Sequence, residues 1–284
     1  MNGRSNQEEN TNNKYTVPSV KTAINILKLL KKRHHRRSSL AEICKALGVS
    51  KSSAFTVLKT LQDGDFVSYD EVEKRYSLGL ALLELGGVVA DEMDDMAIAR
   101  PFVRDLAAQT QETCIICRWI NRQFVVLHCE EPRREVRVTV AAGQHLGHVT
   151  GALGKAYLAF AEEDYVKQVV NEAITHPFTS HSITEPAKFY EELARCRQNG
   201  YADSYEEAIL GVNALAAPVF DKSGNVALVI GILGFSSSLS PDLMRRDGAL
   251  IKEVCQKISA ALGGSNHIGQ PNLAAEFSTA TQQG

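Results

Sequence analysis

The sequence contains no apolar run close to the roughly 18 residues that cross a bilayer. Its first residues, MNGRSNQEENTNNKYT, are polar and lack the apolar core of a secretory signal. Six cysteines are scattered over 284 residues, which is too sparse for a disulfide framework, and we interpret them as reduced thiols. These absences predict a cytoplasmic protein with no membrane partner.

A convincing metal site is also missing. Cys114 and Cys117 (CIIC) have metal-like spacing, and His128 and Cys129 lie on the next expected strand. Positions three apart in a strand point to opposite faces, so both thiols cannot easily reach one ion. We therefore favour core cysteines over a zinc site or thiol sensor.

Catalytic motifs are equally absent. GALGK lacks the glycine spacing of a P-loop, and SSSLS at 236–240 contains no nucleophile elbow. Glu206 and Glu207 are adjacent, so their side chains diverge and do not form an acid–base pair. His145 and His148 either face a binding site or cap loops, and neither belongs to an HExxH motif. We predict no catalytic residue, no metal and no cofactor.

Charge is nearly balanced over the whole chain, at −2, but it is unevenly distributed. Residues 14–78 carry 13 Lys+Arg against 6 Asp+Glu, whereas residues 79–284 carry 17 against 25. An apolar share of 44% and this length fit two soluble globular domains. A basic small domain joined to an acidic larger one points to a polyanion partner for the first domain.

The basic segment has the pattern of a winged helix-turn-helix. SVKTAINILKLLKKR predicts a helix capped by Ser19, with an inward stripe at Val20, Ala23, Ile24, Leu27 and Leu30. SLAEICKAL predicts a second helix with a capping box from Ser39 to Glu42. Gly48 then allows a tight turn, Ser50 caps a third helix, and FVSYD and KRYSL predict a hairpin.

The third helix sorts its residues into two faces. Ala54, Val57, Leu58 and Leu61 fall within roughly 100° of one another. The remaining face is small, polar and basic, which suits base edges and phosphates, and an aromatic there can pack on a thymine methyl. The residues that we expect to contact DNA from this helix are Ser50, Lys51, Ser52, Ser53, Phe55, Thr56 and Lys59.

Two basic features beside this helix remain open. In the wing, Lys74 and Arg75 suit phosphate, but Asp70, Glu71 and Glu73 are repelled by it. KKRHHRR at 31–37 is either a clamp on the DNA backbone or a solvated loop.

The motifs of residues 19–262, taken in order, resemble the IclR family of bacterial transcription regulators. The resemblance rests on LAEICKALGVSKSSAFTVLKTLQDGDFVSYD, GALGKAYLAF and RQNGYADSYEEAILGVNALAAPVFDKSGNVALVIGILGF. It implies a winged helix-turn-helix, a linker helix and a GAF-like α/β effector-binding domain. It also implies a homodimer or a dimer of dimers on double-stranded DNA with a pseudo-palindromic operator, tuned by a small-molecule effector.

The residues of the second half, taken without the resemblance, predict an α+β fold with a mainly antiparallel sheet. Strands are expected at TCIICRWI, QFVVLHCE, EVRVTV, NALAAPVF and NVALVIGIL, with helices between and after them. LGLALLELGGVVADEMDD predicts a connecting helix whose exposed leucines would pair with a second copy. We place tails at 1–13 and 264–284, the DNA-binding domain at 14–78, the linker or dimerisation helix at 79–97 and the effector-binding domain at 98–263.

The family resemblance also nominates effector-binding positions. They are Thr150, Gly151, Ala152, Leu153, Asp203, Glu206, Ala214 and Leu233. Gly151, Ala214 and Leu233 stand where the family often has hydrogen-bonding side chains. Either the effector is more apolar than usual or the site is vestigial, and we favour an apolar or aromatic acid whose carboxylate is held by backbone N–H groups. Small residues there also suit tight helix–sheet packing.

Two functions therefore remain from the sequence. The first is a DNA-binding transcription regulator, with the effector tuning its operator affinity. The alternative is a stand-alone sensor or enzyme whose helical domain binds a protein, although such a helix would expose more apolar surface than residues 51–59 do.

Overall fold

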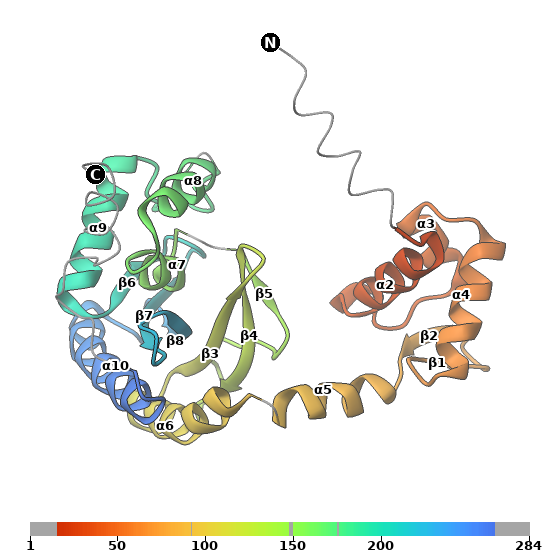
Figure 1. The fold of residues 1–284 in the computed structure, drawn as a ribbon, viewed down its shortest axis with the longest axis horizontal. Helices are drawn as coiled ribbons and strands as arrows, with labels where there is room; N and C mark the ends of the chain where they lie inside the picture. The colour runs from red at the N-terminus through yellow and green to blue at the C-terminus, as the bar shows by residue number, and fades with distance from the viewer. Residues whose placement is uncertain (1–15, 92, 148–149, 175, 265–284) are drawn as a thin grey trace, which may run out of the picture. The chain divides into compact units, whose positions relative to one another are not determined.

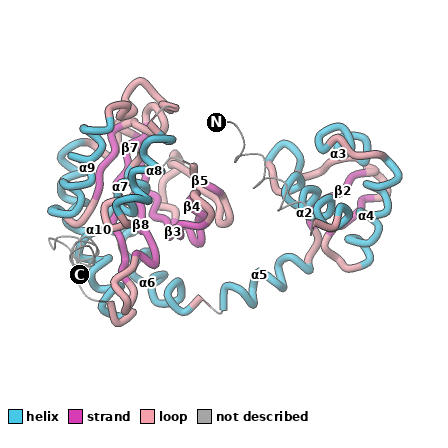
Figure 2. Tube along the Cα trace, turned by 45° about the horizontal axis from the view of Figure 1, so that its top comes forward, coloured by secondary structure: helices cyan, strands magenta, loops and turns pink. Residues whose placement is uncertain are grey.

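The computed structural model describes residues 16–91, 93–147, 150–174 and 176–264. The chain forms two compact units, one up to residue 92 and one from residue 93 onward. The expected tail at 1–13, His148 and residues 265–284 lie outside the described residues. Figure 2 distinguishes the helices from the strands of both units.

The N-terminal unit is a winged helix-turn-helix, as predicted (Figure 1). Its elements are α2 (Pro18–Leu30), the 3-10 turn η1 (Arg33–His35), α3 (Leu40–Leu47), α4 (Lys51–Asp63), β1 (Val67–Asp70), β2 (Arg75–Leu78) and α5 (Ala81–Asp91). The first three α-helices and the hairpin share one apolar core. Its buried members are Ile26, Leu29, Leu30, Ile43, Val57, Leu58, Val67 and Tyr76.

The beginning of α2 differs from the prediction that Ser19 caps it. Val17 is the N-cap residue and makes no side-chain cap, while Pro18 occupies the first helical turn. Proline is well suited to this place because its missing N–H would have no partner inside the helix.

The inward face of α2 was predicted only in part: Leu30 is buried, and Ala23 and Leu27 pack against the core, as expected. Its buried residues are Ile26, Leu29 and Leu30, whereas Val20 and Ile24 are 55% and 46% exposed. The predicted stripe is apolar, but among the described residues nothing buries its members Val20 and Ile24.

The connecting helix α5 is not packed into the apolar core of its unit, as far as the described residues show. None of its side chains whose burial is described is buried, and Leu83, Val88 and Val89 are more than half exposed. The next helix, α6, begins at Asp94, so residues 94–97 of the expected linker belong to it.

The second unit is built on one six-stranded antiparallel sheet, in the order β5-β4-β3-β8-β7-β6. Its elements are α6 (Asp94–Thr110), β3 (Thr113–Ile120), β4 (Gln123–Glu130), β5 (His145–Leu146), α7 (Ala152–Leu158), α8 (Glu163–Ala173), α9 (Pro186–Asn199), β6 (Ala202–Tyr205), β7 (Val212–Phe220), β8 (Val226–Phe235) and α10 (Pro241–Ala261).

Helices cover both faces of this sheet, which explains why β3, β7 and β8 are apolar almost without alternation. α7 packs on β7 and β8, and α8 and α9 share the apolar cluster on that side. α6 and α10 pack against β3 and β7 from the other side. The predicted α+β architecture is confirmed.

One expected strand, EVRVTV at 135–140, is not formed. Val138 and Val140 do pack inward, which accounts for the alternating pattern, but Val136 is 74% exposed. Part of the backbone hydrogen bonding in this segment comes from side chains, since the Thr113 hydroxyl donates to the Val138 carbonyl at 2.5 Å. The short edge strands β5 and β6 were not predicted.

Candidate DNA-reading and effector sites

The turn before α4 fixes the position of that helix. Gly48 ends α3 in the left-handed region at φ 66°, and Ser50 caps α4 by accepting the Ser53 N–H at 3.2 Å. α3 itself carries the predicted capping box between Ser39 and Glu42. On α4, Ala54 is fully buried, so the helix is held by its inner face.

The outer face of α4 is free of protein contacts that would hide it. Lys51, Ser52, Ser53, Phe55, Thr56 and Lys59 are all exposed. Phe55 is 53% exposed and therefore does not fill the domain core. The Thr56 hydroxyl donates to the Ser52 carbonyl at 3.1 Å, which leaves its lone pairs to accept from a base amino group. Lys59 pairs with Asp63 at 3.2 Å on the exposed surface.

The two wing cations differ in their surroundings. Arg75 Nη1 donates to Glu42 Oε2 at 3.1 Å and to the Arg37 carbonyl at 2.9 Å, so its guanidinium ties the wing to α3. Lys74 is exposed at φ 53° and forms no ion pair with any described residue. Of the wing acids, Asp70 accepts the N–H groups of the turn and so serves its geometry.

In the second unit, the predicted effector positions fall in two groups. Ala214 is opposite Leu233 in the β7–β8 ladder, on the face where α7 packs. Thr150 is 2% exposed, and Gly151 is the N-cap residue of α7, with no side-chain cap. A Cβ added to Gly231, on the same face, would lie 3.1 Å from Leu153 Cδ2.

Asp203 and Glu206 do not join this group. Asp203 pairs with Leu215 across β6 and β7, and because neighbours in a ladder share a face, it points away from the Ala214 side. Its carboxylate bonds to Arg195. The Glu206 carboxylate accepts the Gly211 N–H at 2.7 Å and closes its own loop.

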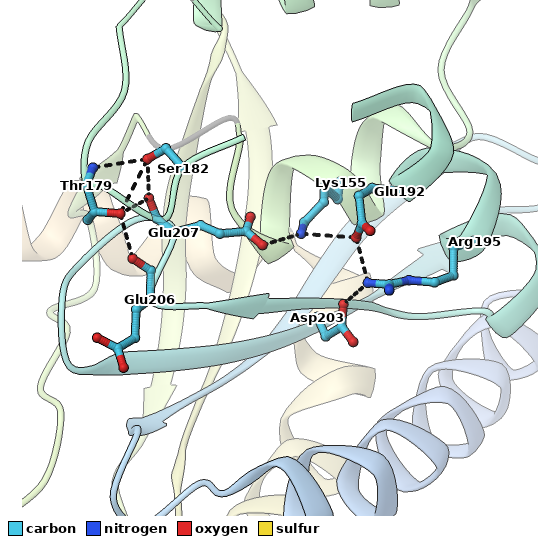
Figure 3. Close-up of polar contacts among 8 residues, drawn as sticks. All are labelled: Lys155, Thr179, Ser182, Glu192, Arg195, Asp203, Glu206 and Glu207. Atoms are coloured by element: carbon cyan, nitrogen blue, oxygen red, sulfur yellow. Dashed lines mark hydrogen bonds and ion pairs between the residues drawn. The ribbon is translucent and has the colours of Figure 1, made fainter. Parts of the chain in front are cut away.

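An ionic cluster runs from α7 through α9 to Asp203 of β6; it is buried at Lys155 and Glu207 and reaches the surface at Arg195 (Figure 3). Lys155 is 1% exposed, and its Nζ lies 2.9 Å from Glu207 Oε1 and 3.5 Å from Glu192 Oε2. Arg195 bonds to Glu192 at 2.6 Å and continues the chain to Asp203. Burial raises the pKa of Glu207, and the positive charge of Lys155 opposes that rise.

Hydroxyls fix the backbone that carries Glu207. Ser182 Oγ donates to its carbonyl at 2.6 Å, and Thr179 Oγ1 donates to the Glu206 carbonyl at 2.8 Å. Two buried oxygens on this side of the sheet have no hydrogen-bond partner among the described residues, Thr150 Oγ1 and Glu207 Oε2. Buried oxygens of this kind are candidates for contact with a ligand.

The cysteines follow the geometry expected of a strand. Cys117 lies in the apolar cluster beneath α7, whereas Cys114 contacts Thr110 of α6, so the two thiols face opposite sides of the sheet. Burial raises the pKa of both thiols. No group of three or more metal-binding side chains gathers anywhere in the described ranges. His145 contacts Gln123 at 2.9 Å on the surface.

Two family models match the chain in the order of its units. A model described as the IclR helix-turn-helix domain matches residues 19–71, and one described as bacterial transcriptional regulator IclR C-terminal matches residues 88–260. The chain belongs to the IclR family of transcriptional regulators.

Individual IclR-family proteins align over nearly their whole length. The HTH-type transcriptional repressor AllR of Salmonella typhi is 31% identical over 263 residues, which is 92% of this chain and 95% of AllR. The HTH-type transcriptional regulator KipR of Bacillus subtilis is 28% identical over 244 residues, 86% of this chain and 97% of KipR. The crystal structure of an IclR transcriptional regulator from Alicyclobacillus acidocaldarius has a TM-score of 0.79 at 35% identity and covers 88% of this chain and 100% of that one.

Membership of the IclR family confirms a DNA-binding transcriptional regulator and the two-unit fold. It also decides against the enzyme alternative, since these relatives are regulators. None of the helices in the described ranges could span a membrane.

For this IclR-family chain, sequence reasoning missed the pair of Lys155 and Glu207. The motifs GKA and YEEA were noted, but a lysine in a helix and a glutamate in a loop both look like surface residues. The available signal was that Lys155 is flanked by small and apolar residues in GALGKAYLAF, so it lies in a helix with no polar face.

Proposed function

We propose that the protein is a homodimeric repressor that reads a pseudo-palindromic operator through α4 and responds to a small effector in its second unit. The observation that carries this proposal is the face of α4 that is left exposed, polar and basic while the opposite face is buried. We infer repression, as opposed to activation, from the similarity over most of the chain to AllR, which is named as a transcriptional repressor.

The major groove admits an α-helix, and hydroxyl side chains let the helix approach base edges closely. Four residues would enter the groove, with Lys51 and Lys59 neutralising phosphates at either end: Ser52, Ser53, Phe55 and Thr56. Lys74 of the wing would contact phosphate, whereas Arg75 would first have to leave Glu42.

The proposed dimer interface is formed by α5. An 11-residue helix of sequence ALLELGGVVAD with no buried side chain among those described leaves apolar area in water. Pairing with α5 of a second copy would cover Leu83, Val88 and Val89 and set the spacing of two α4 helices.

The effector would bind on the α7 face of the sheet. Ala214 and Leu233 offer apolar contact, and the Thr150 hydroxyl supplies a buried polar group with no partner in the described structure. Backbone N–H groups at Gly151, Ala152 and Leu153 lie beside that hydroxyl in the chain and would assist in holding a carboxylate. Lys155 would not serve here, because Glu207 and Glu192 already neutralise it.

The experiment that tests DNA reading is a fluorescence-anisotropy titration against DNA from beside the protein's own gene, with scrambled DNA as reference. We expect operator binding tighter by ~10³ or more. Thr56→Ala should relax the preference at one position of each half-site, while Lys59→Ala should weaken binding to all sequences alike. Thr60→Ala is the matched control, because its hydroxyl makes the same type of bond to the carbonyl four residues back. Equal binding of operator and scrambled DNA by the parent would refute sequence-specific reading.

The dimer is tested by Leu83→Glu, measured by light scattering after size-exclusion chromatography. We expect the variant to elute as a monomer and to lose most of its operator affinity. Leu210→Glu replaces another exposed leucine, 60% exposed in the second unit, and should remain dimeric. A dimeric Leu83→Glu protein would show that α5 does not form the interface.

The effector site is tested through Trp119, the only tryptophan, whose ring centroid lies 5.1 Å from that of Tyr157 on α7. Aromatic and aliphatic acids that shift its emission should also change operator affinity. Thr150→Val removes the hydroxyl at nearly constant shape and should weaken both effects together. Unchanged ligand affinity in Thr150→Val would place the effector elsewhere.

A further inference from the structure

Residues 31–37, the basic loop, carry the densest positive charge in the described chain. All seven are Lys, Arg or His: Lys31, Lys32, Arg33, His34, His35, Arg36 and Arg37. All except His35 are exposed. Neighbouring like charges repel one another, so such a run is most stable where a polyanion neutralises it.

The end of the basic loop is fixed against the wing. Ser38 is 1% exposed and exchanges two backbone hydrogen bonds with Tyr76 of β2, at 3.0 and 2.8 Å. The Arg75 guanidinium also donates to the Arg37 carbonyl at 2.9 Å. The pKa of Asp70 in β1 is lowered, chiefly by the Glu73 N–H and also by the charge of Arg37. The loop therefore lies beside the wing strands.

Four cations of the loop are not held in ion pairs with described residues. Lys32, Arg33, Arg36 and Arg37 form no side-chain ion pair with any residue that the structure describes. Four exposed lysines elsewhere in the chain do form such pairs with nearby acids: Lys59, Lys167, Lys188 and Lys257.

We propose that the basic loop is a second phosphate-binding surface, which grips the DNA backbone beside the groove that α4 reads. It rests on the proposed function, since α4 must bring the duplex to this unit. The occupant follows from charge complementarity: a duplex carries one negative charge per roughly 1.7 Å of its axis. Because the loop is tethered to β2, its cations are held on the wing side and need little further ordering.

The expected magnitude follows from counterion release. Each phosphate that is neutralised contributes about 0.9 to the slope of log K against log salt. If Arg33, Arg36 and Arg37 each contact one phosphate, their loss flattens the slope by about 2.7. The salt sensitivity between about 50 and 200 mM then decreases by about 40-fold.

The test compares Arg33→Gln/Arg36→Gln/Arg37→Gln with a charge-matched control, Lys167→Gln/Lys188→Gln/Lys257→Gln, by anisotropy on operator and scrambled duplexes over a salt series. Only the carbonyl of Arg37 bonds to Arg75, so the loop variant keeps that contact. We expect it to lose slope and affinity equally on both duplexes, at unchanged discrimination and melting temperature. The control should bind like the parent.

A loop variant with the parent's slope and affinity would overturn this proposal while leaving operator reading intact. Loss of discrimination with an unchanged slope would also overturn it, because the loop would then act on base reading. A parent protein that cannot distinguish the two duplexes refutes the proposed function instead. Phosphate-ethylation interference beside each half-site, present in the parent and absent in the variant, would locate the contact.

Discussion

Lys155→Met removes the cation of α7 from the ionic cluster and leaves the Glu207 carboxylate buried without its partner. Lys155 is 1% exposed and lies 2.9 Å from Glu207 Oε1. Breaking a buried ion pair from one side costs roughly 3–5 kcal/mol, because the remaining charge is uncompensated. In a unit of this size each kcal/mol lowers the melting temperature by roughly 2–4 °C, so we expect a decrease of roughly 6–20 °C.

The loss of stability in Lys155→Met should depend on pH. Burial already raises the pKa of Glu207, and Lys155 is the main group that lowers it, so the variant raises that pKa further. The folded variant then binds more protons than the unfolded chain, and its stability falls as pH rises above the ordinary glutamate value of 4.5. The deficit relative to the parent should therefore be smallest in acid and largest at neutral pH.

Calorimetry from acid to neutral pH measures both effects. Lys188→Met is the matched control, because Lys188 pairs with Glu185 at 2.7 Å on the exposed surface, and its transition should not move. Lys155→Met/Glu207→Gln should regain most of the loss, since neutral replacement of both partners is often tolerated. A Lys155→Met transition like that of the parent, or a double variant no more stable than the single, would refute the reasoning.

Three further changes test the packing of the two units. Ser39→Ala removes the side-chain cap of α3 and should cost about 1 kcal/mol, visible as a lower melting temperature of the N-terminal unit at unchanged operator discrimination. Gly234→Ala places a Cβ 2.7 Å from Glu112 Oε2 and 2.9 Å from Leu239 Cβ, so it should destabilise the second unit by roughly 1–3 kcal/mol, more than Gly231→Ala. Burial raises the pKa of Glu112, so parental stability should fall as pH rises through that pKa, and Glu112→Gln should flatten the fall in the same calorimetric series.

Local chemistry made much of the fold predictable. β3 and β4 have the predicted bounds, Thr113–Ile120 and Gln123–Glu130, because each is a long β-rich run beside a polar turn. The capping box at Ser39 and the left-handed Gly48 were correct for the same reason: both depend on residues a few positions apart. The faces of α4 followed from helical periodicity alone.

Contacts between distant segments were not predictable in this way. Arg75 was assigned to phosphate, but its partner Glu42 lies 33 residues earlier, and no local pattern joins them. Asp203 was grouped with Ala214, yet the β6–β7 register places them on opposite faces, and β6 itself was not foreseen. Which face of the sheet a side chain takes depends on the pairing register of its strand, and a register shift of one residue moves it to the opposite face.

The uneven charge of the two units makes the basic loop a main source of attraction for DNA. The second unit and linker carry −8 and repel phosphate, so the attraction for DNA must come from the 13 Lys+Arg of residues 14–78. Lys59 and Arg75 already have acidic partners there, at 3.2 and 3.1 Å. The basic loop supplies five of those 13 cations in one tethered segment. Its removal should therefore reduce the salt dependence of binding more than any other neutralisation of equal size, whereas changes on the outer face of α4 should reduce discrimination instead.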